Sequence, residues 1–244
     1  MENIEGVLLV DKREGILSTS VVNRIKKLLR KANLKIKVGH GGTLDKFASG
    51  LLIILLGKGT KLFEKIKLLP KEYVATVRFG EVRTTDDIYG EIINTFSIKN
   101  LSKRQIETAL KSFEGEILQI PPAYSSIHIE GKRAYKIAKK DYYNALKLLK
   151  PRRVNIYKIK LINFNEDLNE AEIFVKCSGG TYIRSIARDL GQLLEVGAYL
   201  KNLRREKIGE LSVKEAIRDD KIISFQDIVS NLIPIEDFKS RNHL

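Results

Sequence analysis

The chain has 244 residues, 43% of them hydrophobic, and a formal net charge of +14 from 44 Lys and Arg against 30 Asp and Glu. This length suits one large domain or two small ones with a proper core. The basic surplus favours a polyanion such as nucleic acid as partner, with an inert basic surface as the alternative. The single cysteine excludes an internal disulfide. Because no signal peptide or bilayer-spanning apolar run is visible, we expect a soluble, cytoplasmic protein.

Hydrophobic patterns along the first third of the chain predict alternating strands and helices. Residues 6–10 are typical of a buried strand, and the hydroxyls at 18–20 are expected to cap the helix that follows. The apolar run 51–56, bounded by glycines, predicts a second buried strand. Residues 60–68 predict a short helix that stops before Pro70.

The middle of the chain continues this mixture. Alternation at residues 73–79, 154–164 and 171–177 predicts three further strands. A capping box predicts a helix over 101–113, and the glycines at 179–180 open another helix. Together the patterns predict a mixed α+β fold with many strands.

Two stretches differ from this pattern. Residues 121–150 are dense in Lys and Arg, and they carry four tyrosines: Tyr124, Tyr135, Tyr142 and Tyr143. Basic and aromatic residues interleaved on an irregular segment suit looped RNA, whereas a basic surface helix with inward-packed tyrosines is an equal alternative. Residues 219–244 show no strong period, and we expect them to be loosely ordered.

Three residues are candidates for chemistry. Asp45 ends the glycine-rich sequence GHGGTLD at 39–45, where a carboxylate suits a nucleophile or base, although a turn role alone is the alternative. Tyr73 begins a strand and, taken alone, is a packed aromatic. Arg184 lies in the first turn of a helix, where a cation is the disfavoured charge, so it indicates a local carboxylate or an anionic ligand.

Several common sites are excluded. The run GKGT at 57–60 lacks the glycine that a phosphate-binding loop requires. The three histidines have no spacing that makes a metal cage, and no nucleophile-elbow sequence occurs. We therefore expect neither a metal nor any other cofactor.

Five segments carry a resemblance to a known family: GVLLVDK at 6–12, GHGGTLDKFASGLL at 39–52, KEY at 71–73, PPAYSS and GKRAY within 121–135, and CSGGTYIR at 177–184. In this order they resemble the TruB family of tRNA pseudouridine synthases, and the match spans residues 6 to 209. The resemblance implies the pseudouridine synthase α+β fold. In that fold flanking helices surround a mixed, mainly antiparallel central sheet with a catalytic cleft.

The resemblance also implies an isomerase that converts uridine-55 in the T-loop of tRNA to pseudouridine, by breaking the N-glycosidic bond and rejoining the base through C5. Asp45 takes the position of the nucleophile, with attack on the ribose or on the base left open. Tyr73 takes the position of the tyrosine that packs on the target base, and Arg184 that of the arginine paired with the aspartate. Three further positions match residues that bind the substrate: His40, Tyr182 and Leu203.

The T-stem-loop of tRNA is the expected partner, and we expect a monomer with no obligate protein partner and no membrane contact. Basic residues expected to contact RNA are Lys132, Arg133, Lys136, Arg152, Arg153, Arg204 and Arg205. The expected domains are a catalytic domain at 1–210, with an RNA-gripping insertion at 121–150, and a short extension at 211–244. That extension stands in place of most or all of the C-terminal RNA-binding domain that many bacterial members carry.

One departure concerns the Asp45 loop. The family usually has proline after the aspartate, where this chain has Lys46, which predicts a looser turn. The main alternative function is a non-catalytic RNA-binding or tRNA-folding module on the same scaffold. The combination of Asp45, Tyr73 and Arg184 favours the enzyme over such a module. A related synthase acting on other RNA is a second alternative.

Overall fold

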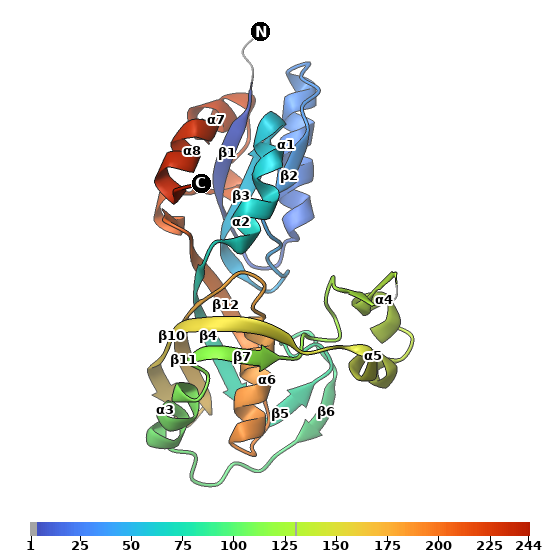
Figure 1. Cartoon of the computed structure of the whole chain (residues 1–244), viewed down its shortest axis with the longest axis vertical. Coiled ribbons are helices and arrows are strands. Elements are labelled where there is room, and N and C mark those ends of the chain that lie inside the picture. The colour runs from blue at the N-terminus through green and yellow to red at the C-terminus, as the bar shows by residue number, and fades with distance from the viewer. Residues whose placement is uncertain (1–3, 130) are drawn as a thin grey trace. The chain divides into compact units, whose positions relative to one another are not determined.

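The computed structural model describes residues 4–129 and 131–244, and the chain divides into two compact units (Figure 1). The first unit contains the residues up to 73 together with 204–244, and the second contains 74–203. The boundary expected near residue 210 therefore does not coincide with the division of the compact units. In the part of the chain that is described, no helix is long and apolar enough to cross a membrane.

The sheet of the first unit is built on two long antiparallel strands, β1 (Gly6–Lys12) and β3 (Ser49–Leu56). The end of β12 (Ala198–Ile208) pairs in parallel with the start of β3. Four short strands complete the pairing: β2 (Val38–His40), β13 (Leu211–Ser212), β14 (Ile217–Arg218) and β15 (Leu232–Ile233). Two 3-10 turns lie among them, Val213–Glu215 and Asp219–Lys221. The strands predicted at 6–10 and 51–56 are confirmed.

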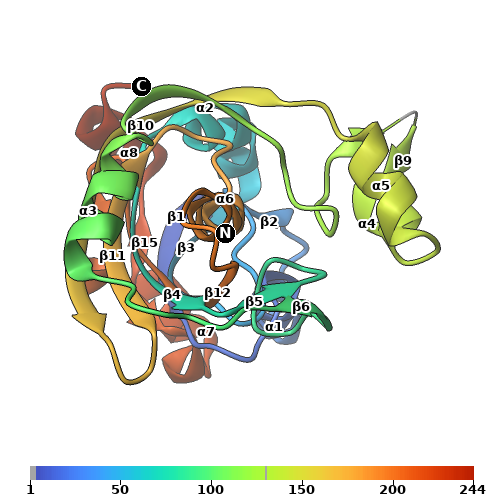
Figure 2. The ribbon, with the colours of Figure 1, turned by 90° about the horizontal axis from the view of Figure 1, so that it is seen from below.

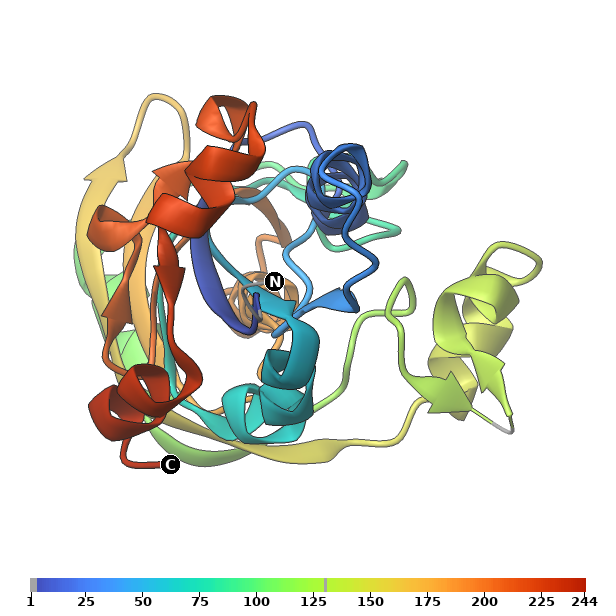
Figure 3. The ribbon, with the colours of Figure 1, turned by 90° about the horizontal axis from the view of Figure 1, so that it is seen from above.

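Helices cover both faces of this sheet (Figure 3). Even-numbered residues of β3 pack with α1 (Ser18–Lys31) and α7 (Phe225–Ser230). Odd-numbered residues pack with α2 (Phe63–Leu68), the 3-10 turn Gly57–Leu62 before it, and α8 (Ile235–Asn242). A strand buried on both faces needs apolar side chains at successive positions, which explains the unbroken run in the sequence.

The expectation that residues 219–244 are loosely ordered is wrong. Ser224 and Asp227 form a capping box at the start of α7, and both Ile228 and Phe238 are fully buried. The helices have only six and eight residues, so neither shows a clear hydrophobic period. Packing against β1 and its neighbours, which no local pattern reports, orders them.

The expected side-chain cap on α1 is also wrong. Its N-cap residue is Leu17, and no side chain accepts a hydrogen bond from the first turn. The hydroxyl of Ser18 bonds instead to the backbone of Leu44, far away in the sequence. The Ser18 hydroxyl, which the sequence predicted as a helix cap, therefore bonds to the backbone of a distant loop instead.

The sheet of the second unit has the order β12-β4-β11-β10-β7. Its strands are β4 (Lys71–Phe79), whose first residues belong to the first unit, and β11 (Glu170–Cys177), β10 (Arg152–Asn165) and β7 (Gly115–Gln119). Both β11 and β7 run antiparallel to β10. Alternate residues of β4 and β11 are buried, as the predicted strands require.

The helices predicted here are confirmed. The first, α3 (Lys103–Lys111), begins with the predicted capping box and packs against β10. The second, α6 (Ile183–Leu193), follows the glycine pair. A separate hairpin, β5 (Glu81–Arg83) and β6 (Ile92–Thr95), was not predicted. Residues 84–91 connect its strands, and we call them the acidic turn.

The insertion at 121–150 forms a small lobe at one end of the second unit, away from α3 (Figure 2). It contains β8 (His128–Ile129), β9 (Lys132–Arg133), α4 (Ala134–Ala138) and α5 (Tyr142–Leu148) around a core of its own. Of the four tyrosines in the insertion, two pack inward and two are exposed, so each interpretation of this segment describes two of them. Tyr124 and Tyr142 stack in this core with ring centroids 6.5 Å apart, whereas Tyr135 and Tyr143 are exposed.

Candidate active site

Asp45 lies in the loop 41–48 between β2 and β3, and its backbone neighbours are fixed from α1. The buried Ser18 hydroxyl donates to the carbonyl oxygen of Leu44 at 2.7 Å and accepts from the Leu44 N–H at 2.9 Å. The residue immediately before Asp45 is therefore held through both of its backbone polar groups. This arrangement restricts where the Asp45 carboxylate can point.

Arg205 of β12 holds the same loop from the other side. Its guanidinium donates to the carbonyl oxygens of Leu51 at 2.7 Å, Thr43 at 3.2 Å and Gly42 at 3.2 Å. Arg205 is only 3% exposed. Arg205 was expected to contact RNA, whereas in this structure its guanidinium is buried and donates to these carbonyls.

Close packing around Arg205 also explains one glycine of the motif. Gly50 pairs with Arg205 across the strands and has φ +104°, which L-amino acids with side chains rarely adopt. A Cβ at this position would lie 2.3 Å from the carbonyl oxygen of Arg205. Glycine is therefore required for β12 to approach the start of β3.

Replacement of Arg205 by Met is expected to lower the free energy of unfolding by about 2–4 kcal/mol, because buried carbonyls lose their donors. Urea titration followed by circular dichroism measures the change. Lys207→Met is the matched control, since Lys207 is an exposed cation on the same strand. Equal losses in both variants would show that the carbonyl contacts of Arg205 are not the source of the stability.

Lys12 of β1 holds the neighbouring segment 13–16, whose Gly15 N–H bonds to the Asp45 loop at Lys46. Lys12 is fully buried, and its Nζ donates to the carbonyl oxygens of Arg13 at 2.8 Å and Ile16 at 2.9 Å. Burial lowers the pKa of Lys12 to about 8, although the nearby carboxylates of Asp219 and Asp45 oppose the change. A buried cation thus lies within electrostatic range of the Asp45 carboxylate.

Lys46 replaces the proline that was expected to stiffen this turn. Its carbonyl oxygen accepts a hydrogen bond from the Gly15 N–H at 2.8 Å. Backbone contacts at Thr43, Leu44 and Lys46 therefore hold the loop from three different segments. These contacts supply restraint that the missing proline ring would otherwise provide.

His40, Tyr73 and Leu203 lie on strands. His40 ends β2, and its pKa is lowered by burial and by the positive charge of Arg205, which favours the neutral ring at neutral pH. Its Nδ1 is buried and has no hydrogen-bond partner among the described residues. Tyr73 on β4 and Leu203 on β12 are both buried.

Arg184 lies in the first turn of α6 and is buried. Its guanidinium donates to the carbonyl oxygens of Thr85 at 2.9 Å and Tyr124 at 3.2 Å. Asp87 of the acidic turn lies 3.7 Å away as an ion-pair partner. The disfavoured charge at the helix start therefore does have a local carboxylate, and sequence reasoning missed it because nothing in the spacing connects residue 87 to residue 184.

Tyr182 is the N-cap residue of the same helix. The side-chain amide of Gln119 accepts from the Tyr182 N–H at 2.8 Å and donates to its carbonyl oxygen at 3.1 Å. Gln119 ends β7 immediately before the insertion. The start of α6 is thereby tied to the point where the insertion leaves the sheet.

The remaining basic candidates differ in their environment. Lys132, Arg133 and Lys136 are exposed in the insertion. Arg204 is paired with Asp11 and with Glu206, each at 3.0 Å. Two exposed residues begin β10, namely Arg152 and Arg153, and Arg153 pairs with Glu116 at 2.7 Å.

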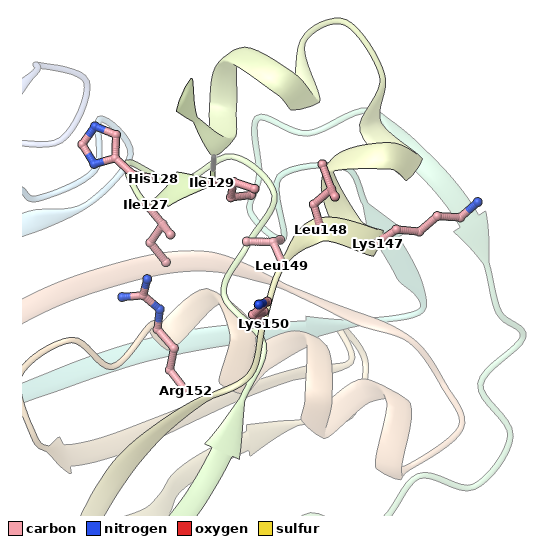
Figure 4. A pocket seen from close by; sticks show the side chains of 8 residues that line it. All are labelled: Ile127, His128, Ile129, Lys147, Leu148, Leu149, Lys150 and Arg152. Carbon is pink, nitrogen blue, oxygen red and sulfur yellow. The ribbon is translucent and has the colours of Figure 1, made fainter. Parts of the chain in front are cut away.

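A hollow of about 380 Å³ opens beside Arg152 (Figure 4). Its lining combines apolar and basic residues from β8, the end of α5 and the start of β10: Ile127, His128, Ile129, Lys147, Leu148, Leu149, Lys150 and Arg152. The guanidinium of Arg152 turns toward Ile127, whereas Lys147 points away from the others. The base of the insertion therefore presents positive charge around an apolar surface.

Comparison with known proteins identifies the class. Residues 26–183 match the TruB family pseudouridylate synthase (N terminal domain). The tRNA pseudouridine synthase B of Aquifex aeolicus is 40% identical over 233 residues, which is 96% of this chain and 78% of that protein. The protein of the same name from Endomicrobium trichonymphae is also 40% identical over 233 residues, covering 96% of this chain and 97% of that one.

Solved structures agree with the sequence relatives. A chain in the crystal structure of a Cbf5-Nop10-Gar1 complex has a TM-score of 0.69 and 28% identity, covering 97% of this chain and 62% of that chain. A chain in an H/ACA RNP bound to a substrate RNA containing 2′-deoxyuridine has a TM-score of 0.68 and 26% identity, covering 97% and 61%. This chain thus spans about three fifths of those solved chains. The predicted pseudouridine synthase fold is confirmed.

The molecule is therefore a pseudouridine synthase by fold and by sequence, an isomerase of the tRNA-processing class. It belongs to the TruB family.

Proposed function

We propose that this chain converts uridine-55 in the T-loop of tRNA to pseudouridine, with Asp45 as the nucleophile. The observation that carries the proposal is the restraint of the Asp45 loop by Ser18 and Arg205, which bond to the backbone of Leu44, Thr43 and Gly42. A restrained carboxylate beside the buried cation of Lys12 is preorganised for attack. The 40% identity to proteins named tRNA pseudouridine synthase B supports the substrate.

In the proposed reaction the bond between N1 of uracil and C1′ of ribose breaks, and a bond between C5 and C1′ forms. The base loses the proton at C5 and gains one at N1, so no external reagent is consumed. Arg184 is the catalytic arginine of this scheme, and Tyr73 packs on the base and assists proton transfer. His40, Tyr182 and Leu203 receive the nucleotide, which must leave its stack to be reached.

The direct test is to incubate the protein with unmodified tRNA transcripts and to map pseudouridine by position. We expect a single conversion, at uridine-55. Conversion at a different position would support a related synthase acting elsewhere. Binding without any conversion would support the RNA-folding module, and either result would overturn the proposal.

Affinity for tRNA is expected to fall steeply with salt, because basic side chains release counterions from phosphates. Replacing Lys132, Arg133 and Lys136 of the insertion by Gln should reduce the slope of log affinity against log salt by about 2–3. Filter binding between low and moderate salt measures this slope. The matched control replaces Lys103, Arg104 and Lys111 of α3, which removes the same charges from the same unit. Equal effects in both variants would assign binding to net charge rather than to the insertion.

A further inference from the structure

Two arginines on α6 lie four residues apart, and therefore on one side of the helix. Arg184 donates to Thr85 in the acidic turn and to Tyr124 in the insertion. Arg188 repeats this arrangement one turn later. Its Nη1 lies 3.0 Å from Oδ2 of Asp86, and its Nη2 donates to the carbonyl oxygen of Ile120 at 2.8 Å.

Both arginines thus connect the acidic turn to the same short segment, residues 119–124, which we call the insertion root. Ser185 adds a hydrogen bond from its hydroxyl to the carbonyl oxygen of Ile120 at 2.8 Å. The acidic turn is fixed in turn by β12, because the Leu200 N–H donates to the carbonyl oxygen of Asp86 at 3.0 Å. Movement of the root would therefore act on both arginines together.

Burying the Asp86 carboxylate of this ion pair costs free energy of folding. Asp86 is 4% exposed, and burial raises its pKa to about 6, although Arg188 and Arg184 oppose the change. The other ionisable groups that face it are Asp189 on α6 and Tyr142 on α5. Because the folded state raises this pKa, the group contributes more stability as pH falls through 6, when it takes up a proton. At neutral pH its charge costs stability, which argues against a purely structural purpose.

We propose that the buried Asp86–Arg188 ion pair is a positioning device for the reaction, which holds the acidic turn and the insertion root in one arrangement and so sets the orientation of Arg184. The inference rests on the proposed roles of Arg184 and of the insertion. Asp86 touches neither substrate nor reacting atoms in this scheme, and it acts through Arg188 and the turn that it shares with Thr85 and Asp87.

Asp86→Asn tests the proposal, because it removes the charge while keeping the shape and tolerates the positive φ of this residue. We expect the single-turnover rate on tRNA to fall between about 10- and 100-fold, as for a misplaced catalytic group. The dissociation constant for tRNA should stay within about twofold, and the midpoint of thermal unfolding should hold or rise. Glu170→Gln is the control, since it breaks the Lys201 and Arg78 ion pairs of the same unit and leaves the residues of α6 unchanged.

The pH profile gives a readout that a structural role would not move. The ratio of wild-type to Asp86→Asn rates should be greatest at pH 8 and approach 1 near pH 5, as wild-type Asp86 becomes neutral. A ratio of 1 at every pH would overturn the proposal. A lower rate in Asp86→Asn would also overturn the proposal if the midpoint of thermal unfolding fell as well and Glu170→Gln showed the same two changes.

Hydrogen exchange of the free protein keeps the test independent of the proposed activity. Asp86→Asn should raise exchange in peptides covering the acidic turn and in those covering the insertion root, whereas Glu170→Gln should change neither. Faster exchange in the turn alone would overturn joint positioning. If the wild-type protein formed no pseudouridine, the proposed function would fail, and the exchange result would still decide whether the pair couples the two segments.

Discussion

Asp45→Asn is expected to abolish pseudouridine formation, with a loss of at least about 10⁴-fold in the single-turnover rate, while tRNA still binds. An amide of the same shape lacks the charge and the nucleophilicity of the carboxylate. The fold should persist, because Ser18 and Arg205 hold the loop through the backbone of Leu44, Thr43 and Gly42. Quantifying pseudouridine in tRNA under single-turnover conditions measures the effect.

Asp237→Asn is the control for this experiment, since Asp237 is an exposed carboxylate on α8 of the same unit. It should react at the wild-type rate. Turnover within tenfold of wild type in Asp45→Asn would exclude Asp45 as the nucleophile. Loss of binding with intact chemistry would make Asp45 an RNA-recognition residue and would contradict the proposal as well.

Arg184→Lys is expected to lower the rate by about 100-fold or more, although the charge is kept. The guanidinium donates from two nitrogens and reaches Thr85, Tyr124 and Asp87 at once. An ammonium is a point charge on a flexible stem, so it cannot satisfy these partners and still present a planar fork to a carboxylate. Single-turnover kinetics with saturating enzyme separate this loss from any loss of binding.

The control for Arg184→Lys is Arg78→Lys, which changes an arginine of β4 in the same unit that pairs with Glu170. Near-normal turnover in Arg184→Lys would mean that positive charge alone suffices and would argue against a paired carboxylate. Comparable losses in both variants would indicate a general effect on the second unit.

Much of the fold could be predicted from local pattern. The strand at β3 was recognisable because both of its faces are buried, which leaves an unbroken apolar run. The capping box of α3 was recognisable because the side chains of Ser102 and Gln105 each accept a hydrogen bond from the other residue's backbone N–H within one turn. Short elements such as α7 and β15 were missed, because contacts with β1 rather than their own sequence stabilise them.

In the candidate site, too, some residues could be recognised from the sequence, whereas the role of Arg205 could not. Asp45, Tyr73 and Arg184 were singled out by residue type, place on an element and resemblance. Arg205 was assigned to RNA on its charge, yet its burial and its carbonyl partners make it a support of the loop. Charge in a sequence does not say which direction a side chain takes.

The sequence by itself determined the order of the long strands and helices, the family and the three residues expected to carry the chemistry, because these depend on local periodicity and on motifs of adjacent residues. Only the tertiary structure decided how those residues are held. The hydroxyl of Ser18, the guanidinium of Arg205 and the carboxylates of Asp86 and Asp87 meet partners 26 to 163 positions away along the chain. Hydrogen bonds and ion pairs of that span depend on packing, which no local pattern encodes.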